Sequence, residues 1–336
     1  MLTVAGICAG AIFAAQTFLR KVERHRFDLR GKTVLITGGS RGFGLAIAEE
    51  FASHGARLAL CARDSDELRK ACDSLRAKGF DAQPFAADIT QSSEIDELVK
   101  RVVGHFGHID VLVNDAGRIS VGSFESFTHK DFEEAMDLMF WAPVNLTFAV
   151  LPHMHERRSG HIVNITSVGG RVSIPHLLPY SCAKFAFVGF STGLSTELKE
   201  KGIDVLTVVP GLMRTGSYLN AEFKGAAKQE FAWFGLLGNL PGFSVAANFA
   251  AASVRKALEN REQVCTISLP AKILIALEAL APEVNAAVLD LMNRFMLPKS
   301  ANKDPRSGKA LNPSLNRVFQ GLTALGKLAA ARFNES

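Results

Sequence analysis

Three side chains in the middle of the chain have types and spacings that fit proton chemistry. Tyr180 and Lys184 stand four residues apart, and Ser167 lies thirteen residues before the tyrosine. Positions i and i+4 share one face of a helix, and a nearby ammonium favours the ionised form of a phenol, whose reference pKa is about 10. A serine hydroxyl beside the phenol would hold a carbonyl oxygen. The three residues therefore indicate proton transfer to or from an alcohol or ketone.

The elements that must position these residues alternate along the chain from Lys32 onward. Short apolar runs rich in β-branched residues are followed by segments of helical periodicity. This alternation predicts right-handed βαβ units, and hence an α/β fold with a doubly wound parallel sheet covered by helices on both faces. The expected strands are 33–37, 57–61, 82–86, 109–113, 161–165, 204–209 and 263–267, and the expected helices are 44–54, 65–78, 92–106, about 129–156, 180–201 and 244–260.

A glycine-rich turn joins the first expected strand to the first expected helix. Glycines let the backbone turn tightly and approach a pyrophosphate at the helix N-terminus, where free N–H groups and the helix dipole favour anions. Because the turn stands between the strand and the helix of a βαβ unit, it predicts a dinucleotide site. The candidate binding positions are Gly38, Ser40, Arg41, Gly42, Phe43 and Gly44.

The end of the second expected strand bears on which nicotinamide dinucleotide would bind. An acidic residue there binds the ribose hydroxyls of NAD, whereas an arginine accommodates the 2′-phosphate of NADP. Arg63 stands at this strand end, and Arg41 in the glycine turn would assist it. Asp64 follows the arginine and is expected to cap the next helix. The sequence therefore favours NADP(H) over NAD(H), with two ordinary surface arginines as the alternative.

The first 26 residues differ in character from the rest of the chain. Residues 2–19 are almost wholly apolar, and a basic cluster follows with Arg20, Lys21, Arg24 and Arg26. Eighteen helical residues span roughly 27 Å, close to the thickness of a bilayer core. Positive charges after the apolar run favour an uncleaved membrane anchor with the remaining chain on the cytoplasmic side. The alternative is a helix that packs on the protein or lies in the membrane interface.

After the N-terminal segment, residues 27–268 are expected to form a catalytic domain and residues 269–336 a helical extension. Residues 211–243 interrupt the alternation, are rich in Phe, Leu and Gly, and are predicted to form a substrate lid, with a plain insertion as the alternative. In the extension, helices are expected at 271–281 and 283–296. The second carries an apolar stripe that is expected to pack against the protein rather than a membrane, formed by Val284, Val288, Leu291, Met292 and Phe295.

Composition narrows the function classes. The net charge of +5 is modest and lies mainly at the two ends, without the aromatic and basic interleaving typical of nucleic-acid binding, so no nucleic-acid partner is expected. The five cysteines are scattered and odd in number, which favours reduced thiols in a cytosol-facing domain. His153 and His155 lack an evident third ligand, so no metal site is expected.

Taken together, these residues give the chain a resemblance to the short-chain dehydrogenase/reductase superfamily, whose domain is a Rossmann-type fold. The resemblance covers about residues 29–267. It rests on motifs that occur in the family's order on the expected elements: Thr37-Gly-x-x-x-Gly-x-Gly44, Asn114-Asp-Ala-Gly117, Ser167, Tyr180-x-x-x-Lys184 and Pro210-Gly211.

The resemblance assigns roles to particular positions. Tyr180 would be the general acid or base, Lys184 would hold the nicotinamide ribose and lower the pKa of the tyrosine, and Ser167 would orient the substrate oxygen. The remaining cofactor contacts would be Asp88 beside the adenine, Asn114, Ala116 and Gly117 along the pocket wall, and Pro210, Gly211 and Thr215 near the carboxamide. Members often pair through the long helix and the tyrosine-bearing helix, so a homo-oligomer is expected.

Two positions depart from the family pattern. Asp115 replaces the usual second asparagine of Asn-Asn-Ala-Gly, a change expected to be of minor consequence. Met139 stands where members usually carry an asparagine that supports a water-linked proton relay to the lysine, and methionine cannot usefully hydrogen-bond a water.

The resulting hypothesis is an NADP(H)-dependent carbonyl reductase or alcohol dehydrogenase. The apolar N-terminus and lid favour a lipophilic substrate of the acyl, retinoid, steroid or sphingoid type. Two alternatives remain open: a membrane-attached NADP-binding scaffold or sensor without turnover, and an epimerase or dehydratase that uses a transient keto intermediate.

Overall fold

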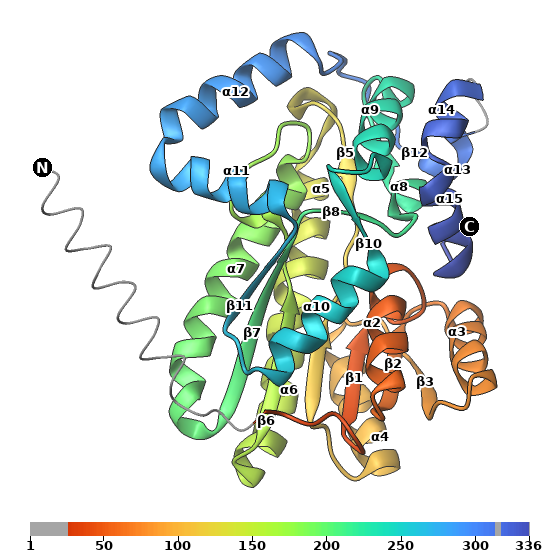
Figure 1. Ribbon diagram of the computed structural model, residues 1–336, viewed down its shortest axis with the longest axis vertical. Coiled ribbons are helices and arrows are strands. Elements are labelled where there is room, and N and C mark those ends of the chain that lie inside the picture. The colour runs from red at the N-terminus through yellow and green to blue at the C-terminus, as the bar shows by residue number, and fades with distance from the viewer. Residues whose placement is uncertain (1–25, 313–316, 336) are drawn as a thin grey trace, which may run out of the picture.

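Seven parallel strands form the central sheet in the computed structural model, which describes residues 26–312 and 317–335 (Figure 1). The strand order is β11-β7-β6-β4-β1-β2-β3, so the direction of winding reverses between β1 and β4. The strands are β1 (Thr33–Thr37), β2 (Arg57–Ala62), β3 (Ala82–Ala86), β4 (Val111–Asn114), β6 (Gly160–Ile165), β7 (Ile203–Pro210) and β11 (Val264–Ile267). The predicted doubly wound α/β fold is confirmed, and the strands end together at one carboxyl edge.

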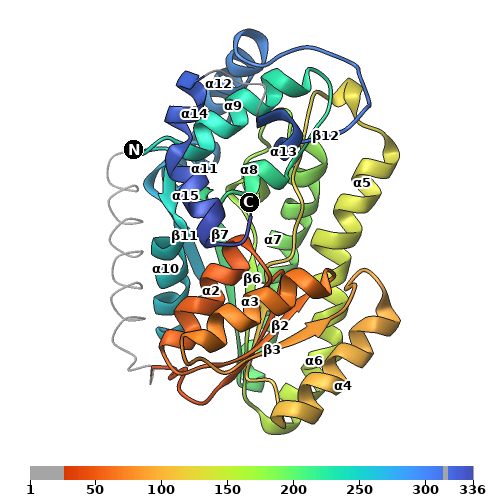
Figure 2. The ribbon, with the colours of Figure 1, turned by 90° about the vertical axis from the view of Figure 1, so that its right-hand side faces the viewer.

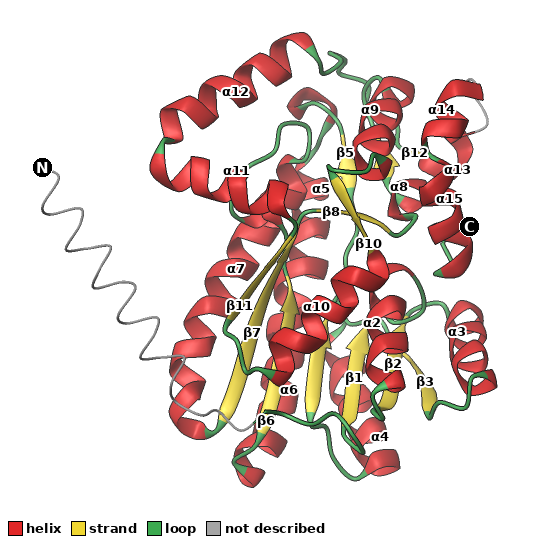
Figure 3. Cartoon of the chain, in the orientation of Figure 1, coloured by secondary structure: helices red, strands yellow, loops and turns green. Residues whose placement is uncertain are grey.

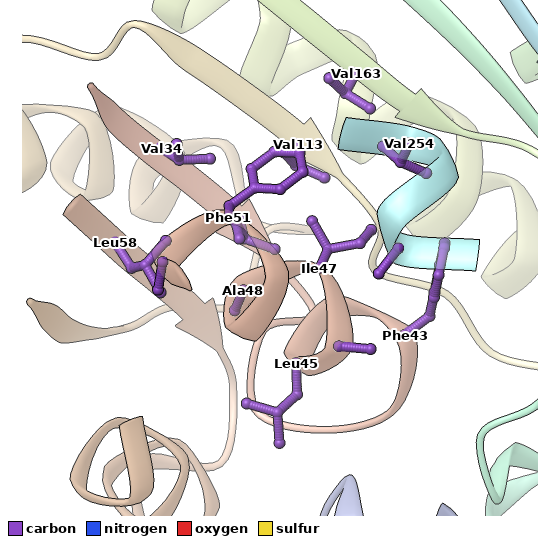
Figure 4. Packing of buried hydrophobic residues seen from close by; sticks show 14 of the residues in the cluster. Val34, Phe43, Leu45, Ile47, Ala48, Phe51, Leu58, Val113, Val163 and Val254 are labelled. Carbon is purple, nitrogen blue, oxygen red and sulfur yellow. The ribbon is translucent and has the colours of Figure 1, made fainter. Parts of the chain in front are cut away.

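Helices cover both faces of this sheet (Figure 2). One face carries α2 (Gly42–Ser53), α3 (Ser65–Ala77) and α10 (Ala247–Glu259), and the other carries α4 (Ser92–Phe106), α6 (Ala142–Arg157) and α7 (Leu178–Leu198). In the core, Phe51 and Ile47 of α2 pack between Val34 and Val113 of the sheet and Val254 of α10 (Figure 4). All five residues of β1 are buried, including the two terminal threonines, because helices cover both faces of this central strand.

The long helix expected at 129–156 is present but not uniform. It consists of α5 (His129–Met136), a π-helical segment η2 (Asp137–Trp141) and α6. Within the described residues, this stretch is the one helix long and apolar enough to cross a bilayer. Leu146, Val150 and Met154 are fully buried against the sheet. We therefore interpret it as a core helix of the domain.

The expected lid segment is a folded cap with its own helices rather than an irregular loop (Figure 3). Phe223, Phe231 and Phe234 are buried together in a separate apolar cluster, which stabilises the cap. The cap segment and the residues just after it contain β8 (Leu212–Arg214), α8 (Ser217–Asn220), β9 (Glu222–Phe223), α9 (Ala227–Asn239) and β10 (Ser244–Ala246). Two short strands from other parts of the chain lie beside them, β5 (Ser120–Val121) and β12 (Arg306–Ser307). Elsewhere, short 3-10 turns are formed by η1 (Phe124–Ser126), η3 (Val168–Gly170) and η4 (Lys199–Lys201). Strand β8 pairs with β10, and β9 pairs with both β5 and β12.

The C-terminal extension is helical, as expected, but residues 26–312 and 317–335 leave its apolar stripe largely exposed. It comprises α11 (Leu269–Leu280), α12 (Pro282–Phe295), α13 (Gly308–Leu311), α14 (Arg317–Leu322) and α15 (Ala324–Arg332). In α12 the side chains of Val284, Leu291 and Phe295 are 54%, 59% and 74% exposed. The expectation that this stripe packs against the protein is therefore wrong, because α12 projects from the domain as one arm of a hairpin with α11 (Figure 1). The predicted anchor and its basic flank, residues 1–26, lie outside the described residues except for Arg26.

Candidate active site

The loops after β1 and β4 approach each other closely at the carboxyl edge of the sheet. The Thr37 hydroxyl accepts hydrogen bonds from the backbone N–H groups of Asp115 and Ala116, at 3.2 and 3.3 Å. Gly38 has a φ of +70°, and a Cβ added there would lie 3.0 Å from the Ala116 Cα. A Cβ added to Gly44 would lie 2.8 Å from a carboxylate oxygen of Asp115. Only glycine fits at either position, so the turn brings bare backbone to the start of α2.

A chain of buried polar side chains ties four elements together behind this turn. The Asn114 amide donates to Asn164 Oδ1 at 2.9 Å, and the Asn164 amide donates to the Ser191 hydroxyl at 3.0 Å. Ser191 in turn shares a 2.7 Å hydrogen bond with Thr207 on β7. Asn114 is only 4% exposed, so its side chain fixes β4 against β6 rather than facing an open pocket.

Sequence analysis missed Asn164, Ser191 and Thr207. The sequence carries only a weak indication that these residues are buried and hydrogen-bonded. Each is a polar residue inside an apolar stretch of a strand or helix, where burial is costly unless a partner is present.

Ser167, Tyr180 and Lys184 do meet in space. The lysine ammonium lies 5.9 Å from the centre of the Tyr180 ring, as expected for an i, i+4 pair on α7. A Cβ added to Gly169 would lie 3.1 Å from the Tyr180 ring and 3.4 Å from the Ser167 hydroxyl, which places both beside the same short turn. Burial raises the pKa of Tyr180, while a hydrogen bond with the Ser167 hydroxyl lowers it.

Lys184 is buried, and its surroundings set its charge. Its side-chain nitrogen donates to the Ile165 carbonyl at 2.8 Å, and the residue is 4% exposed. Burial lowers the pKa of Lys184 to about 8, and the negative charge of Asp115 raises it. At neutral pH the ammonium form therefore prevails, one helical turn from the Tyr180 phenol.

The Asp115 carboxylate lies against the glycine turn, where a Cβ added to Gly44 would approach it to 2.8 Å. Burial raises the pKa of its carboxyl to about 7, while Lys184 and a hydrogen bond from the Gly44 backbone N–H lower it. This side chain therefore connects the glycine turn electrostatically with Lys184, and the expected minor consequence of the replacement stays a prediction.

Met139 lies beside Gly117, and its correspondence to the family's asparagine stays a prediction. It is 2% exposed within the π-helical segment, and its sulfur would lie 3.6 Å from a Cβ added to Gly117. A thioether cannot order a water by strong hydrogen bonds. The contact of Lys184 with the Ile165 carbonyl is instead the one strong hydrogen bond seen for its ammonium in the described part of the chain.

The residues predicted to bind the adenosine half of the dinucleotide lie on the loops after β1, β2 and β3. Arg63 is exposed and has no partner among the described residues, whereas Arg41 pairs with Glu67 at 3.2 Å. Ser40 also donates a short hydrogen bond to the Glu67 carboxylate. Asp64 accepts from the backbone N–H groups at the start of α3, at 3.0 and 2.9 Å, which confirms the capping prediction.

The other predicted cofactor-binding residues lie along the same carboxyl edge of the sheet. The Asp88 carboxylate accepts hydrogen bonds from the backbone and the hydroxyl of Thr90, so it shapes the loop after β3. Pro210 ends β7, and the Gly211 N–H donates to the Ile267 carbonyl at 3.1 Å. Thr215 is 3% exposed and caps the turn before α8 through its hydroxyl. In the described residues, no group of three or more His, Cys, Asp or Glu side chains is arranged to hold a metal ion.

The sequence pattern of the short chain dehydrogenase family matches residues 32–222, more than half of the chain. A fatty acyl-CoA reductase from Acinetobacter baylyi is 36% identical over 192 residues, which are 56% of this chain and 65% of that protein. The matches span 65% and 66% of the first two curated relatives, slightly less than two-thirds of their length. The chain belongs to the short-chain dehydrogenase/reductase family.

Solved structures agree with this assignment. A short-chain dehydrogenase from Streptomyces avermitilis superposes with a TM-score of 0.66 at 33% identity, covering 78% of this chain and 98% of that one. A metagenomic short-chain oxidoreductase, solved in complex with NADP, superposes with a TM-score of 0.53 at 33% identity and covers 55% of this chain and 84% of that one.

The coupling between Asp115 and Lys184 gives a first prediction. Asp115 is largely ionised at the pH at which Lys184 titrates, so Asp115→Asn removes a nearby negative charge and shifts the pKa of Lys184 below about 8. NMR titration of protein labelled at the lysine side chains measures this pKa, with Lys184→Arg to assign the signal. Asp73→Asn, on the exposed side of α3, serves as the control and leaves it unchanged. An equal or higher pKa in Asp115→Asn would contradict the coupling.

Proposed function

We propose that the protein is an NADP(H)-dependent oxidoreductase that interconverts a carbonyl compound and its secondary alcohol. One observation carries the proposal. The hydroxyl groups of Ser167 and Tyr180 and the ammonium of Lys184 lie together at the carboxyl edge of the sheet, on the same edge as the glycine turn. The family match supports the same reaction class.

The residues present fit a dinucleotide. Gly38 and Gly44 let the backbone of the turn lie directly against the loop after β4, and α2 directs backbone N–H groups and its dipole at the carboxyl edge of the sheet. A bound nicotinamide supplies or accepts the hydride. Gly211, which follows β7, and Thr215, which follows β8, would face its carboxamide, and Ser40 and Arg41 would hold the adenosine ribose.

The chain's own residues would manage the proton. In the direction of reduction, Tyr180 Oη donates its proton to the substrate oxygen, which the Ser167 hydroxyl holds by a hydrogen bond. Lys184 stabilises the phenolate that remains, because its positive charge lies on the same helix face. In oxidation the same phenolate accepts the proton from the alcohol.

Tyr180→Phe tests the proton role. Loss of the phenol is expected to reduce kcat by about 10²- to 10⁴-fold, the usual contribution of a general acid, while NADPH binding changes little. NADPH oxidation with a panel of hydrophobic ketones and aldehydes measures this, and titration of NADPH fluorescence measures binding. Tyr218→Phe is the matched control, since Tyr218 is the chain's other tyrosine and is buried in the cap. Equal turnover by Tyr180→Phe and the unmodified protein would refute the assignment.

The preference for NADP(H) is supported by Arg63, which is exposed and free of partners among the described residues at the end of β2. Arg41 and Ser40 are held by Glu67, so a 2′-phosphate must displace this carboxylate to reach them. Arg63 would therefore supply the first charge-assisted hydrogen bond to the phosphate.

A change of charge at Arg63 tests this preference. Arg63→Asp is expected to weaken NADPH binding by about tenfold or more, the equivalent of one lost charge-assisted hydrogen bond, and to leave NADH binding nearly unchanged. Arg69→Asp, on the exposed side of α3, is the control. An unchanged ratio of the two dissociation constants would show that Arg63 does not select the cofactor.

A lipophilic substrate is supported by the surroundings of the site. The cap over the carboxyl edge is rich in aromatic side chains, and the relative from Acinetobacter baylyi is named as a fatty acyl-CoA reductase. A homodimer through the long helix and α7 is supported by the exposed side chains of Trp141, Phe148 and Phe185.

Membrane association is supported by two independent features. Residues 2–19 are almost wholly apolar, and the hairpin of α11 and α12 exposes an apolar stripe on each arm. In α11 the exposed residues are Leu269, Ile273 and Leu280, at 68%, 59% and 86%. Stripes of this kind on a projecting hairpin fit insertion at the level of lipid headgroups.

The hairpin's contribution can be separated from that of the N-terminal segment. In protein that starts at Arg26, the double change Leu291→Glu and Phe295→Glu is expected to abolish residual binding to vesicles of phosphatidylcholine and phosphatidylglycerol. Flotation of the vesicles measures the bound fraction. Asn293→Glu on the same helix is the control. If the double variant floats as well as the unchanged protein, the hairpin does not contact the membrane.

A further inference from the structure

The end of the chain lies on the glycine turn. The segment 324–335, called the C-terminal tail below, consists of α15 and the residues up to Glu335, and both views place it above the start of α2 (Figures 1 and 2). The Gly42 backbone N–H donates to the Phe333 carbonyl at 2.8 Å. The Asn334 amide donates to the Ser40 carbonyl at 3.1 Å. The tail is therefore bound by two residues of the predicted pyrophosphate loop.

The carboxylate of Glu335 lies at the N-terminal end of α2. The residue is only 5% exposed, and a Cβ added to Gly42 would overlap its carboxylate. Asn220 holds it in place by donating to the Glu335 carbonyl at 3.0 Å and also to the carboxylate. An anion at the start of a helix that follows a glycine turn takes the position that suits a phosphate.

The tail also closes the other side of the site. A Cβ added to Gly216 would lie 2.7 Å from the Ala330 Cα and 2.8 Å from the Glu335 Cβ. The tail thus extends from the turn after β1 to the segment after β8, directly beside Thr215. A dinucleotide that runs from Ser40 to Thr215 must cross this same space.

The surroundings of Glu335 disfavour the ionised form of its carboxyl. Burial raises the pKa of the Glu335 carboxyl to about 7, with Arg41 and the Asn220 hydrogen bond lowering it and Glu67 raising it further. The negative charge of Glu335 also raises the pKa of the Asp115 carboxyl. A pyrophosphate would bring more negative charge into the same few ångströms, so both anions cannot be held there together.

We propose that the C-terminal tail is an internal competitor of the dinucleotide, in which the Phe333 carbonyl and the Glu335 carboxylate take the place of the pyrophosphate at α2. The tail must leave before the cofactor binds. This inference rests on the proposed dinucleotide site. Because only the fraction of molecules with an undocked tail can bind, the apparent dissociation constant exceeds the intrinsic one, by about fivefold when four molecules in five are docked.

Two variants release the tail by different means. Removal of residues 333–336 deletes the contacts outright, and Glu335→Lys places a positive charge at the positive end of α2 while it retains the buried Phe333. Each is expected to lower the dissociation constant of NADPH by about fivefold in calorimetric titration. Thermal melting confirms that each variant is folded. Glu283→Lys, on the exposed α12, is the matched control and leaves the constant unchanged.

A peptide with the sequence of residues 324–336 completes the test. Added to the truncated protein, it is expected to raise the apparent dissociation constant of NADPH in proportion to its concentration. Unchanged or weaker NADPH binding by the folded variants would overturn the inference while leaving the dinucleotide site intact. Failure of both the truncated and the complete protein to bind NADPH or NADH would overturn the dinucleotide site and the inference with it.

Discussion

The close approach of the loops after β1 and β4 is the constraint on which the candidate site depends. The Thr37 hydroxyl joins the two loops, and Gly38 and Gly44 contribute no side chain where Ala116 and Asp115 approach them. This contact fixes the start of α2 at the carboxyl edge, where its N–H groups and dipole meet the ends of the neighbouring strands. The buried chain from Asn114 through Asn164 to α7 then holds the catalytic candidates at the same edge.

The close approach of these loops also brings several charged side chains near one another. Asp115 reaches from β4 to the Gly44 N–H, Lys184 lies buried on α7, and Glu335 arrives from the end of the chain. In the proposed mechanism the Lys184 ammonium would help the phenol to ionise, while the Asp115 carboxylate raises the pKa of Lys184. Any further anion at α2 changes this balance, so cofactor binding and the ionisation of Lys184 are expected to be coupled.

The sequence predicts those features that depend on local periodicity or on short motifs. The strands, the glycine turn, the Asp64 cap and the adjacency of Tyr180 and Lys184 are of this kind. The contacts that it does not reveal are made between distant segments or depend on a partner. Asn334 and Ser40 are separated by 294 positions, and nothing in the local pattern of either residue indicates their hydrogen bond. The stripe on α12 reads equally well as a buried or an exposed face, because amphipathic spacing does not say what covers it.

The central claim is that this edge of the sheet transfers a hydride from a nicotinamide to a carbonyl carbon. Reduction of a hydrophobic ketone with NADPH deuterated stereospecifically at C4 of the nicotinamide tests it most directly. Mass spectrometry of the product alcohol is expected to find deuterium at the carbinol carbon with one of the two labelled forms and not with the other. Absence of deuterium from the alcohol with both forms, or equal incorporation from both, would contradict the account.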